Sequence, residues 1–560
     1  MLPSNLQTSI HGRSWARGQD VMTRFDLIEE GWLPLQRASD GWIYEVGIAA
    51  AVLDAHEYTE LATELPTQVP ALLRQVLLPV VADALGAPAD RADWGRRFAA
   101  GAFSQDERER LRAYLDQHRD RFDLFHDTQP FAQAGRLEAV SGDTKGSGLL
   151  VATMPTGNNV PLFASRTEGD RLALTPAQAA RWLLHTQCWD TAAIKTGAKG
   201  DDHVKAGKTT GNPTGPLGQL GVLIPSGRTL YETLLLNIPI GSQAYAGVPQ
   251  WRVSPIGPAW DSHVPAGLLE LWTWQSRRIR LICDPDSEDR EVTRVVLAAG
   301  DRVRAIPEWE PHTAWAYGKP AKKAAAENRR PRRHVPGKAL WRGLQGLLAT
   351  ELIDAPTGGS VETSVLLVQL ADLEEDGKLP AGFPLRLDAY GLLYGNQSAI
   401  IEDLYYDRIP LPVAALRADA ELYGHLLSMA AQADQLAQAV NYLSADLRRA
   451  AGLDPIPWDK AQRPGEQVLH ALNPVVRRVL AGMQRTPDEE TIGRGLLAWE
   501  QTAHQETRRV AGPLFATLPE SVFGGRHGAQ AGTTYSLGTA EDNFRTRLTQ
   551  ILPVASQARR

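Results

Sequence analysis

LLYGNQSAIIED, residues 392–403, marks the point where the chain changes character. Gly395, Asn396 and Gln397 at its centre favour a tight turn, because glycine and asparagine accept backbone conformations that most residues avoid. A long helical pattern begins soon afterwards, past Pro410. The turn is therefore either a plain connection or a polar recognition element at the junction of two domains.

Apolar side chains beyond Pro410 alternate at spacings of four and three residues, which places them on one face of a long helix. Segment 468–483, which we expect to restart at Pro474, and segment 541–551 show further helical patterns. The stripe of the first helix comprises Leu422, Leu426, Met429, Ala433, Leu436, Val440, Leu443 and Leu447.

A capping box at Thr486, with Pro487 and Glu489 behind it, predicts the start of another helix and brings the helices of this region to about four. We therefore predict an α+β fold. A large mixed α/β N-terminal domain with irregular loops would occupy residues 1–405, and a C-terminal four-helix bundle would occupy residues 406–560.

The N-terminal part carries both strand and helix signals. Two short apolar runs around a turn predict a β-hairpin within residues 25–45. A capping box that begins at Thr175 predicts a helix over residues 175–196. Strands are expected at residues 278–283 and 292–298.

The composition indicates a protein with more than one core. A chain of 560 residues with 43% hydrophobic composition exceeds what one core usually holds. Its net charge of -6 argues against a free-standing nucleic-acid coat. With only Cys188 and Cys283, and with no signal peptide or apolar run of roughly 18 residues, we expect a soluble cytoplasmic protein without a membrane partner.

Tryptophan is frequent, with 15 residues in the chain. Their clustering favours a large irregular core, and surfaces on which bases stack are the alternative. The cluster comprises Trp251, Trp260, Trp272, Trp274, Trp309, Trp315 and Trp341.

Two segments are unusually polar. Residues 197–221 are rich in glycine and almost free of apolar side chains, so we expect a surface loop with available backbone amides. Residues 318–342 gather basic side chains, which indicates either a patch that faces phosphates or a solvated linker.

Templates for catalysis find little support. Gly207-Lys208-Thr209 resembles the end of a phosphate-binding loop, but Asp202 stands where the first glycine is required. His126-Asp127 could begin a metal-dependent site, although no further ligands follow at a recognisable spacing. The sequence therefore favours a protein that is not an enzyme and that needs neither metal nor cofactor.

Several short motifs follow one another in a specific order. They are FDLIEEGWLPL at residues 25–35, QPFAQ at 129–133, MPTGNNVPLF at 154–163, GRTLYETLLLNIP after the glycine-rich segment, LICDP from Leu281, and YGNQSAI. In this order they resemble the CasA family, the large subunits of type I-E Cascade complexes. The similarity covers most of residues 22–410.

The resemblance implies a function. Members of this family assemble with other Cascade subunits and CRISPR RNA (crRNA). They read the protospacer-adjacent motif of target double-stranded DNA from its minor groove, and they help to recruit a helicase-nuclease. A minor-groove reader fits a glycine-rich loop and a long amide side chain, because that groove distinguishes base pairs poorly and tolerates several motifs.

The resemblance also implies site residues. The family's glutamine wedge corresponds to Gln397, with Gly395 and Asn396 beside it. The lysine finger is absent, because acidic residues follow the Cys-Asp-Pro element, so Arg290 or a basic residue elsewhere would have to serve instead. The glycine-rich loop corresponds either to the segment that we favour, Gly197, Ala198, Lys199 and Gly200, or to Gly207 and Lys208.

Two further sets complete the expected interface. A loop near residues 141–157 would dock the subunit onto guide RNA. Residues expected at this docking loop are Val151, Met154, Asn158 and Asn159. Phosphate contacts without sequence preference are expected from Lys205, Lys208, Arg329, Arg330, Arg332 and Arg333.

These observations lead to one hypothesis and two rivals. The hypothesis is a subunit that senses the motif and starts strand separation and R-loop formation with Gln397. One rival is a scaffold for RNA and partner subunits that senses no motif. The other is a metal-dependent nuclease built around His126 and Asp127.

Overall fold

The computed structural model describes residues 24–558 apart from residues 157–169, 242–244, 319–328, 355–358, 418–420, 458–462, 486–487, 517 and 528–533. The chain divides into two compact units. The first contains residues 1–336, 364–369 and 388–407, and the second contains residues 337–363, 370–387 and 408–560. The second unit thus includes two stretches that precede residue 405, where we expect the domain boundary.

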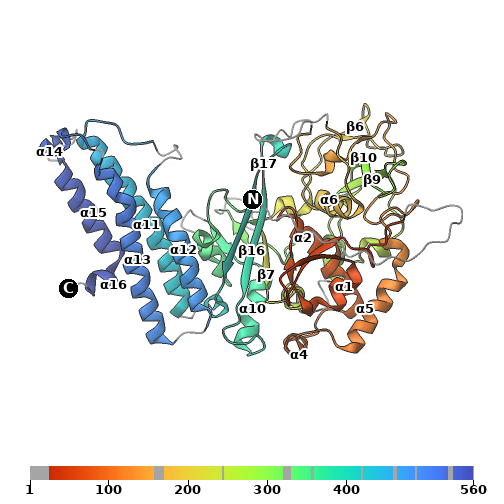
Figure 1. Cartoon of the computed structure of the whole chain (residues 1–560), viewed down its shortest axis with the longest axis horizontal. Helices are drawn as coiled ribbons and strands as arrows, with labels where there is room; N and C mark the ends of the chain where they lie inside the picture. The colour runs from red at the N-terminus through yellow and green to blue at the C-terminus, as the bar shows by residue number, and fades with distance from the viewer. Residues whose placement is uncertain are drawn as a thin grey trace. The chain divides into compact units, whose positions relative to one another are not determined.

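Short helices dominate the start of the first unit (Figure 1). Its helices are α1 (Ile48–Leu53), α2 (Gln68–Leu72), α3 (Leu78–Leu85), α4 (Arg91–Ala100), α5 (Gln105–Gln117), α6 (Pro176–Trp189), α7 (Leu230–Leu236) and α8 (Leu268–Trp272). A π-helical turn joins α2 to α3, so that residues Gln68–Leu85 form one apolar helical stretch. This stretch could cross a membrane by length and composition alone, but most of it is buried inside the fold.

The predicted hairpin and the two predicted strands are confirmed in the first unit. β1 pairs with β2 in antiparallel fashion, with Leu33 opposite Val46. β9 and β10 form an antiparallel pair within a sheet of order β4-β10-β5-β6. Strands of this unit are β1 (Leu33–Arg37), β2 (Ile43–Val46), β3 (Tyr58–Leu61), β4 (Lys145–Gly146), β5 (Lys195–Thr196), β6 (Lys208–Thr209), β7 (Val222–Ser226), β8 (Ser262–His263), β9 (Arg277–Cys283), β10 (Val292–Ala299), β11 (Arg302–Val303), β12 (Trp315–Tyr317) and β13 (Arg329–Pro331).

Helix α6 begins as predicted and ends earlier than predicted. Thr175 and Gln178 form the expected capping box. The helix stops at Trp189 rather than at Thr196, because Asp190 takes an extended conformation and the chain then runs into β5. Asp190 is therefore the C-cap residue of α6.

The second unit is mainly helical, as predicted. The apolar stripe of α11 is buried, and α11 packs against α12, α13 and α15. Helix α12 continues through Pro474, so the expected restart there is wrong. The capping pair Thr486 and Pro487 lies outside the described residues.

The elements of this unit are α9 (Leu344–Leu348), β14 (Ile353–Asp354), β15 (Ser360–Glu362), α11 (Glu421–Ala450), α12 (Gly465–Met483), α13 (Glu489–Ala516), α14 (Ser521–Gly524), β18 (Arg526–His527), β19 (Thr534–Tyr535), α15 (Leu537–Ile551) and α16 (Pro553–Gln557). Three elements contain residues of both units: α10 (Val365–Glu375), β16 (Arg386–Tyr394) and β17 (Ile401–Pro410).

A buried ion pair ties distant parts of the first unit together. Both guanidinium NH groups of Arg74 reach the carboxylate of Glu310, at 2.8 and 2.9 Å, and both side chains are almost fully buried. Burial alone would raise the pKa of Glu310, but the charge of Arg74 lowers it to about 2. The ionised form is therefore the one that the fold stabilises.

Replacing Glu310 by Gln should destabilise the protein by about 3–5 kcal/mol, because Arg74 would remain buried without a counter-charge. The pKa of Glu310 is lower in the folded state than its ordinary value of 4.5. The ion pair therefore contributes its full stability above about pH 4.5, and this stability is lost as the pH falls toward about 2. Thermal unfolding across this pH interval measures the effect. The variant should lose this part of the acid dependence, whereas the exposed-pair control Glu541→Gln should change stability by less than about 1 kcal/mol. Equal effects of the two substitutions would contradict the prediction.

Candidate nucleic-acid interface

The turn between β16 and β17, residues 395–398, is termed the wedge turn. Asn396 and Gln397 are exposed at its tip, as expected of a recognition element. Gln397 and Ser398 both lie in the left-handed backbone region, with φ of 53° and 54°. Such residues cost about 1 kcal/mol or more each and persist only where the surroundings hold them.

Gly395 lies at a crowded position at the start of the wedge turn. A Cβ at this position would lie 2.3 Å from Oε1 of Glu402 and 2.8 Å from Cγ1 of Ile400. The amide of Gly395 donates to the carbonyl of Ile400 at 3.0 Å, which closes the turn. The close approach explains the glycine of the YGNQSAI motif in local terms.

The end of α6 holds the wedge turn from two sides. The Ala192 amide donates to the carbonyl of Ser398 at 2.8 Å. The hydroxyl of Tyr394, directly before the turn, donates to the carbonyl of Trp189 at 2.5 Å. These contacts fix the strained backbone, and the Gln397 side chain remains exposed.

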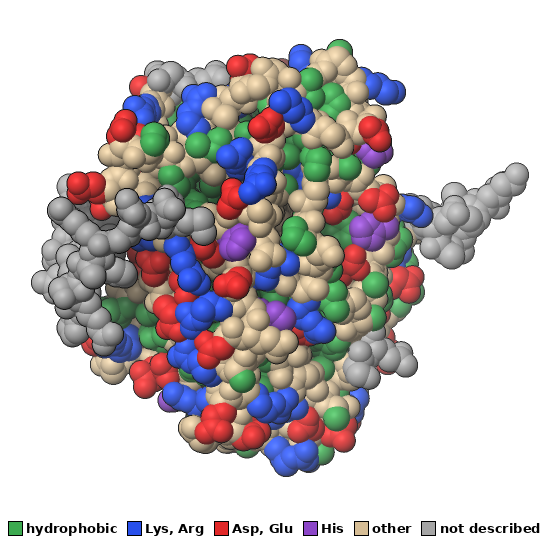
Figure 2. Space-filling model, turned by 90° about the vertical axis from the view of Figure 1, so that its right-hand side faces the viewer, with side chains coloured by type: hydrophobic (Ala, Val, Ile, Leu, Met, Phe, Trp, Pro, Cys, Tyr) green, Lys and Arg blue, Asp and Glu red, His purple; other side chains and the backbone are tan. Residues whose placement is uncertain are grey.

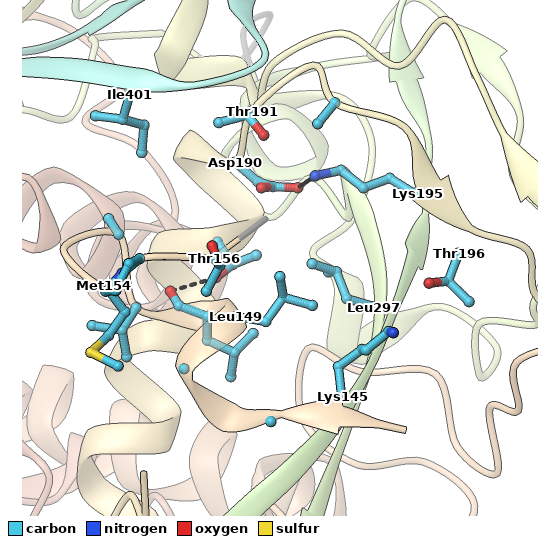
Figure 3. A pocket seen from close by; sticks show the side chains of 18 of the residues that line it. Lys145, Leu149, Met154, Thr156, Asp190, Thr191, Lys195, Thr196, Leu297 and Ile401 are labelled. Carbon is cyan, nitrogen blue, oxygen red and sulfur yellow. Dashed lines mark hydrogen bonds and ion pairs between the residues drawn. The ribbon is translucent and has the colours of Figure 1, made fainter. Parts of the chain in front are cut away.

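A pocket of about 880 Å³ brings the wedge turn and the docking loop together (Figure 3). Gln397 lines it from one element, and Val151 and Met154 line it from another. Both of these docking-loop residues are largely buried. Asn158 and Asn159, also expected at the docking loop, lie outside the described residues.

The glycine-rich segment forms a short hairpin, residues 195–209, termed the basic hairpin. β5 pairs with β6, and the amide of Gly197 donates to the carbonyl of Gly207 at 2.9 Å. The two alternatives for the glycine-rich loop are therefore neighbours on opposite arms of one hairpin. Gly197 and Ala198 are buried, and the Lys199 amide donates to the carbonyl of Glu138.

The expectation of available amides is therefore wrong for Gly197 and Lys199, because pairing within the protein uses them. Of the favoured segment, Lys199 and Gly200 are exposed, and the Lys199 ammonium pairs with Glu138 at 2.7 Å.

A tight turn at residues 205–208, termed the tip of the basic hairpin, offers the more open surface. Lys205 and Lys208 exchange both backbone hydrogen bonds around Ala206 and Gly207, whose φ angles are 49° and 73°. This is a two-residue turn of the type that joins antiparallel strands tightly. All four residues are exposed, so two ammonium groups flank a tip that carries little side-chain bulk.

Trp260 holds the basic hairpin from its other side. Its ring stacks with that of His203 at 4.1 Å, and the guanidinium carbon of Arg302 lies 3.6 Å from its centroid. Arg302 also donates to the carbonyl of Thr210 at 2.9 Å. Trp260 thus supports the hairpin, and most of the tryptophan cluster is core: Trp251, Trp272, Trp274, Trp315 and Trp341 are buried.

Asp190 connects the basic hairpin to α6, a role that the sequence analysis missed. Its carboxylate accepts a hydrogen bond from the Lys195 ammonium at 2.6 Å (Figure 3). It accepts a second hydrogen bond from the Arg277 guanidinium. Burial alone would raise the pKa of Asp190, but these two cations hold it below its usual value. Because an acid at a helix C-terminus is unfavourable next to the helix dipole, ending the helix at Trp189 would have indicated that Asp190 needs cationic partners.

Arg290 is engaged elsewhere. Its guanidinium pairs with Glu30 at 2.9 Å and donates to the carbonyl of Arg24. Arg294 and Lys145, rather than Arg290, line the pocket with Gln397. As a substitute for the lysine finger, Arg290 would first have to leave Glu30.

The expected arginine patch is half accessible. Arg330 and Arg333 are exposed. Arg329 packs 4.0 Å from the ring centroid of Trp315, and burial lowers the pKa of Arg332. On the face drawn in Figure 2, Lys and Arg side chains are interspersed with Asp and Glu side chains rather than forming one continuous basic surface.

The residues of the nuclease rival have local roles. The His126 ring nitrogen accepts the amides of Thr128 and Gln129, and Asp127 pairs with Arg136. Across the described part of the chain, no group of three or more His, Cys, Asp or Glu side chains could hold a metal ion. His126 and Asp127 thus act as turn and surface residues in this structure.

Residues 26–510 match the family model of CRISPR-associated protein Cse1. The chain belongs to this family. The CRISPR-associated protein CasA/Cse1 of Thermus thermophilus is 28% identical over 452 residues, which are 77% of this chain and 79% of that protein. The Cse1 structure of Thermobifida fusca is 32% identical with a TM-score of 0.81, over 95% of this chain and 99% of that one.

The resemblance to the CasA family is confirmed by these matches, and with it the class of Cse1/CasA large subunits. The fold is also that of a chain in a CRISPR RNA-guided surveillance complex, at 21% identity and a TM-score of 0.61, over 88% of this chain and 99% of that one. The mixed fold with a helical C-terminal region agrees with the Cse1 structures.

Replacing Gly197 by Ala should destabilise the basic hairpin. The new Cβ would lie 2.5 Å from Cγ1 of Val204 and 2.9 Å from the carbonyl of Gly207, and overpacking of this kind costs about 1–3 kcal/mol. Hydrogen exchange at the amides of residues 197 and 208 should accelerate in the variant. The control is Gly146→Ala, where nothing lies within 4 Å of the new Cβ. Unchanged exchange in the Gly197 variant would contradict the tight packing of this hairpin.

Proposed function

We propose that this chain works within a type I-E Cascade, beside the other subunits and the crRNA, as the subunit that reads the protospacer-adjacent motif of target double-stranded DNA. In this proposal the tip of the basic hairpin meets the minor groove, and Gln397 enters the base stack next to the motif. R-loop formation then proceeds from that point, and the complete R-loop recruits the helicase-nuclease. The chain itself breaks no bond.

The exposure of Gln397 on an anchored turn is the observation that carries the proposal. A wedge must replace a stacked base step, which costs a few kcal/mol of unstacking. A side chain on a flexible turn would bind less strongly, because part of the binding free energy would be spent on ordering the turn. The wedge turn is held by Ala192 and Tyr394, so its backbone is ordered before DNA arrives.

The basic hairpin supplies a second, sequence-tolerant contact in this proposal. Because Ala206 and Gly207 carry little bulk, a duplex could approach the backbone at the tip closely. Lys205 and Lys208 would neutralise phosphates on either side without reading bases. We therefore now favour Gly207 and Lys208 over Gly197 to Gly200 as the segment against DNA.

Gln397→Ala in the assembled complex should slow R-loop formation on a linear motif-bearing duplex by about tenfold or more, since the unstacking step loses its wedge. On a target already opened beside the motif, the same substitution should have little effect. The matched control is Gln117→Ala, which removes an exposed glutamine from the end of α5. Equal loss on both targets, or no loss on either, would argue for a scaffold that does not separate strands.

Lys205→Ala and Lys208→Ala should each weaken binding to duplexes with and without the motif by a similar factor. Each lost phosphate contact should reduce the slope of log affinity against log salt by about 0.9. Lys378→Ala, which removes an exposed lysine of the second unit, is the comparison variant. A salt slope that stays constant in both hairpin variants would remove the hairpin from the DNA interface.

A further inference from the structure

We propose that Asp190 is a positioning residue that fixes the basic hairpin and the wedge turn relative to each other. The inference deepens the proposed function and rests on it. Asp190 touches neither the hairpin tip nor Gln397. It acts through the two elements that its neighbours hold.

The first tie runs to the basic hairpin. Lys195 belongs to β5 and is opposite Thr209 of β6, so a shift of its side chain moves the base of the hairpin. Only 7% of the Lys195 side chain is exposed, and its ammonium meets the Asp190 carboxylate at 2.6 Å. A buried ammonium needs such a partner, because its desolvation is otherwise uncompensated.

The second tie runs to the wedge turn. Arg277 binds the Asp190 carboxylate and donates to the carbonyl of Thr191 at 2.8 Å, which fixes the two residues after α6. The next residue, Ala192, holds the carbonyl of Ser398. The Asp190 carboxylate thus fixes residues 190–192, the segment that holds the wedge turn.

The pocket shows the same arrangement. Asp190 and Lys195 point toward one another at its wall, with Thr191 beside them and Ile401, just past the wedge turn, on the neighbouring strand (Figure 3). The chain between Trp189 and Thr196 connects the hairpin to the residues that hold the turn, so its conformation affects the separation of the two elements. A duplex that contacts both would sense this separation directly.

The charges of Asp190 and its two partners decide which substitution can test the inference. Asp190, Lys195 and Arg277 carry one negative and two positive charges. Asp190→Asn alone would leave two cations buried side by side and could prevent folding. Lys195→Met leaves Asp190 paired with Arg277, so that one negative and one positive charge remain together, and it removes only the tie between α6 and the hairpin.

The test is the rate of R-loop formation on a linear motif-bearing duplex, divided by the rate on the same duplex opened beside the motif. In Lys195→Met this ratio should fall by about tenfold, with the melting temperature close to that of the wild type. Combined with Gln397→Ala, Lys195→Met should lower the ratio little further, because both changes act on the same strand-separation step. The control Arg108→Met removes an ion pair of 2.9 Å with Asp54 elsewhere in the first unit.

Three outcomes would overturn the inference. They are a ratio equal to that of the wild type, an equal slowing on both substrates, and a full additional loss in the Gln397→Ala background. Failure of the proposed function would give a different result, because Gln397→Ala would then leave the ratio of the two rates unchanged, with or without Lys195→Met.

Discussion

A single carboxylate at the carboxyl end of α6, with 14% of its side chain exposed, organises the candidate interface. Asp190 balances Lys195 from the basic hairpin and Arg277 from β9, and the next residues hold the wedge turn. Leaving either cation without a counter-charge in a poorly hydrated site would destabilise the fold. The end of one helix, the hairpin that follows it and one strand turn are therefore tied together, although Tyr394, directly before that turn, lies 205 residues from Trp189 in the sequence.

Membership of the Cse1 family and this local geometry support the same picture from different sides. The family match covers residues 26–510 and says nothing about individual contacts. The geometry adds an exposed amide on an anchored, strained turn and a hairpin tip flanked by two lysines. Minor-groove recognition needs little more than this, because that groove is read by shape and by a few donors.

Local signals predicted local structure well. The capping box at Thr175, the strands β9 and β10 and the exposure of Gln397 followed from nearest-neighbour chemistry. Long-range contacts were beyond such signals. Gly197 is buried because it pairs with Gly207 and its neighbours, and Arg290 is held by Glu30, 260 residues away in the chain. The end of α6 was misjudged because apolar residues continue past the last hydrogen-bonded turn.

Disulfide trapping tests the central claim most directly. The native cysteines leave a simple background, since Cys188 is buried and Cys283 is half-buried. A Gln397→Cys subunit in the assembled complex would be mixed with duplexes that carry a thiol-tethered base at successive positions beside the motif. The account predicts one strong cross-link, at the base step adjoining the motif, and only on motif-bearing DNA. Absence of a cross-link, or equal cross-linking without the motif, would contradict it.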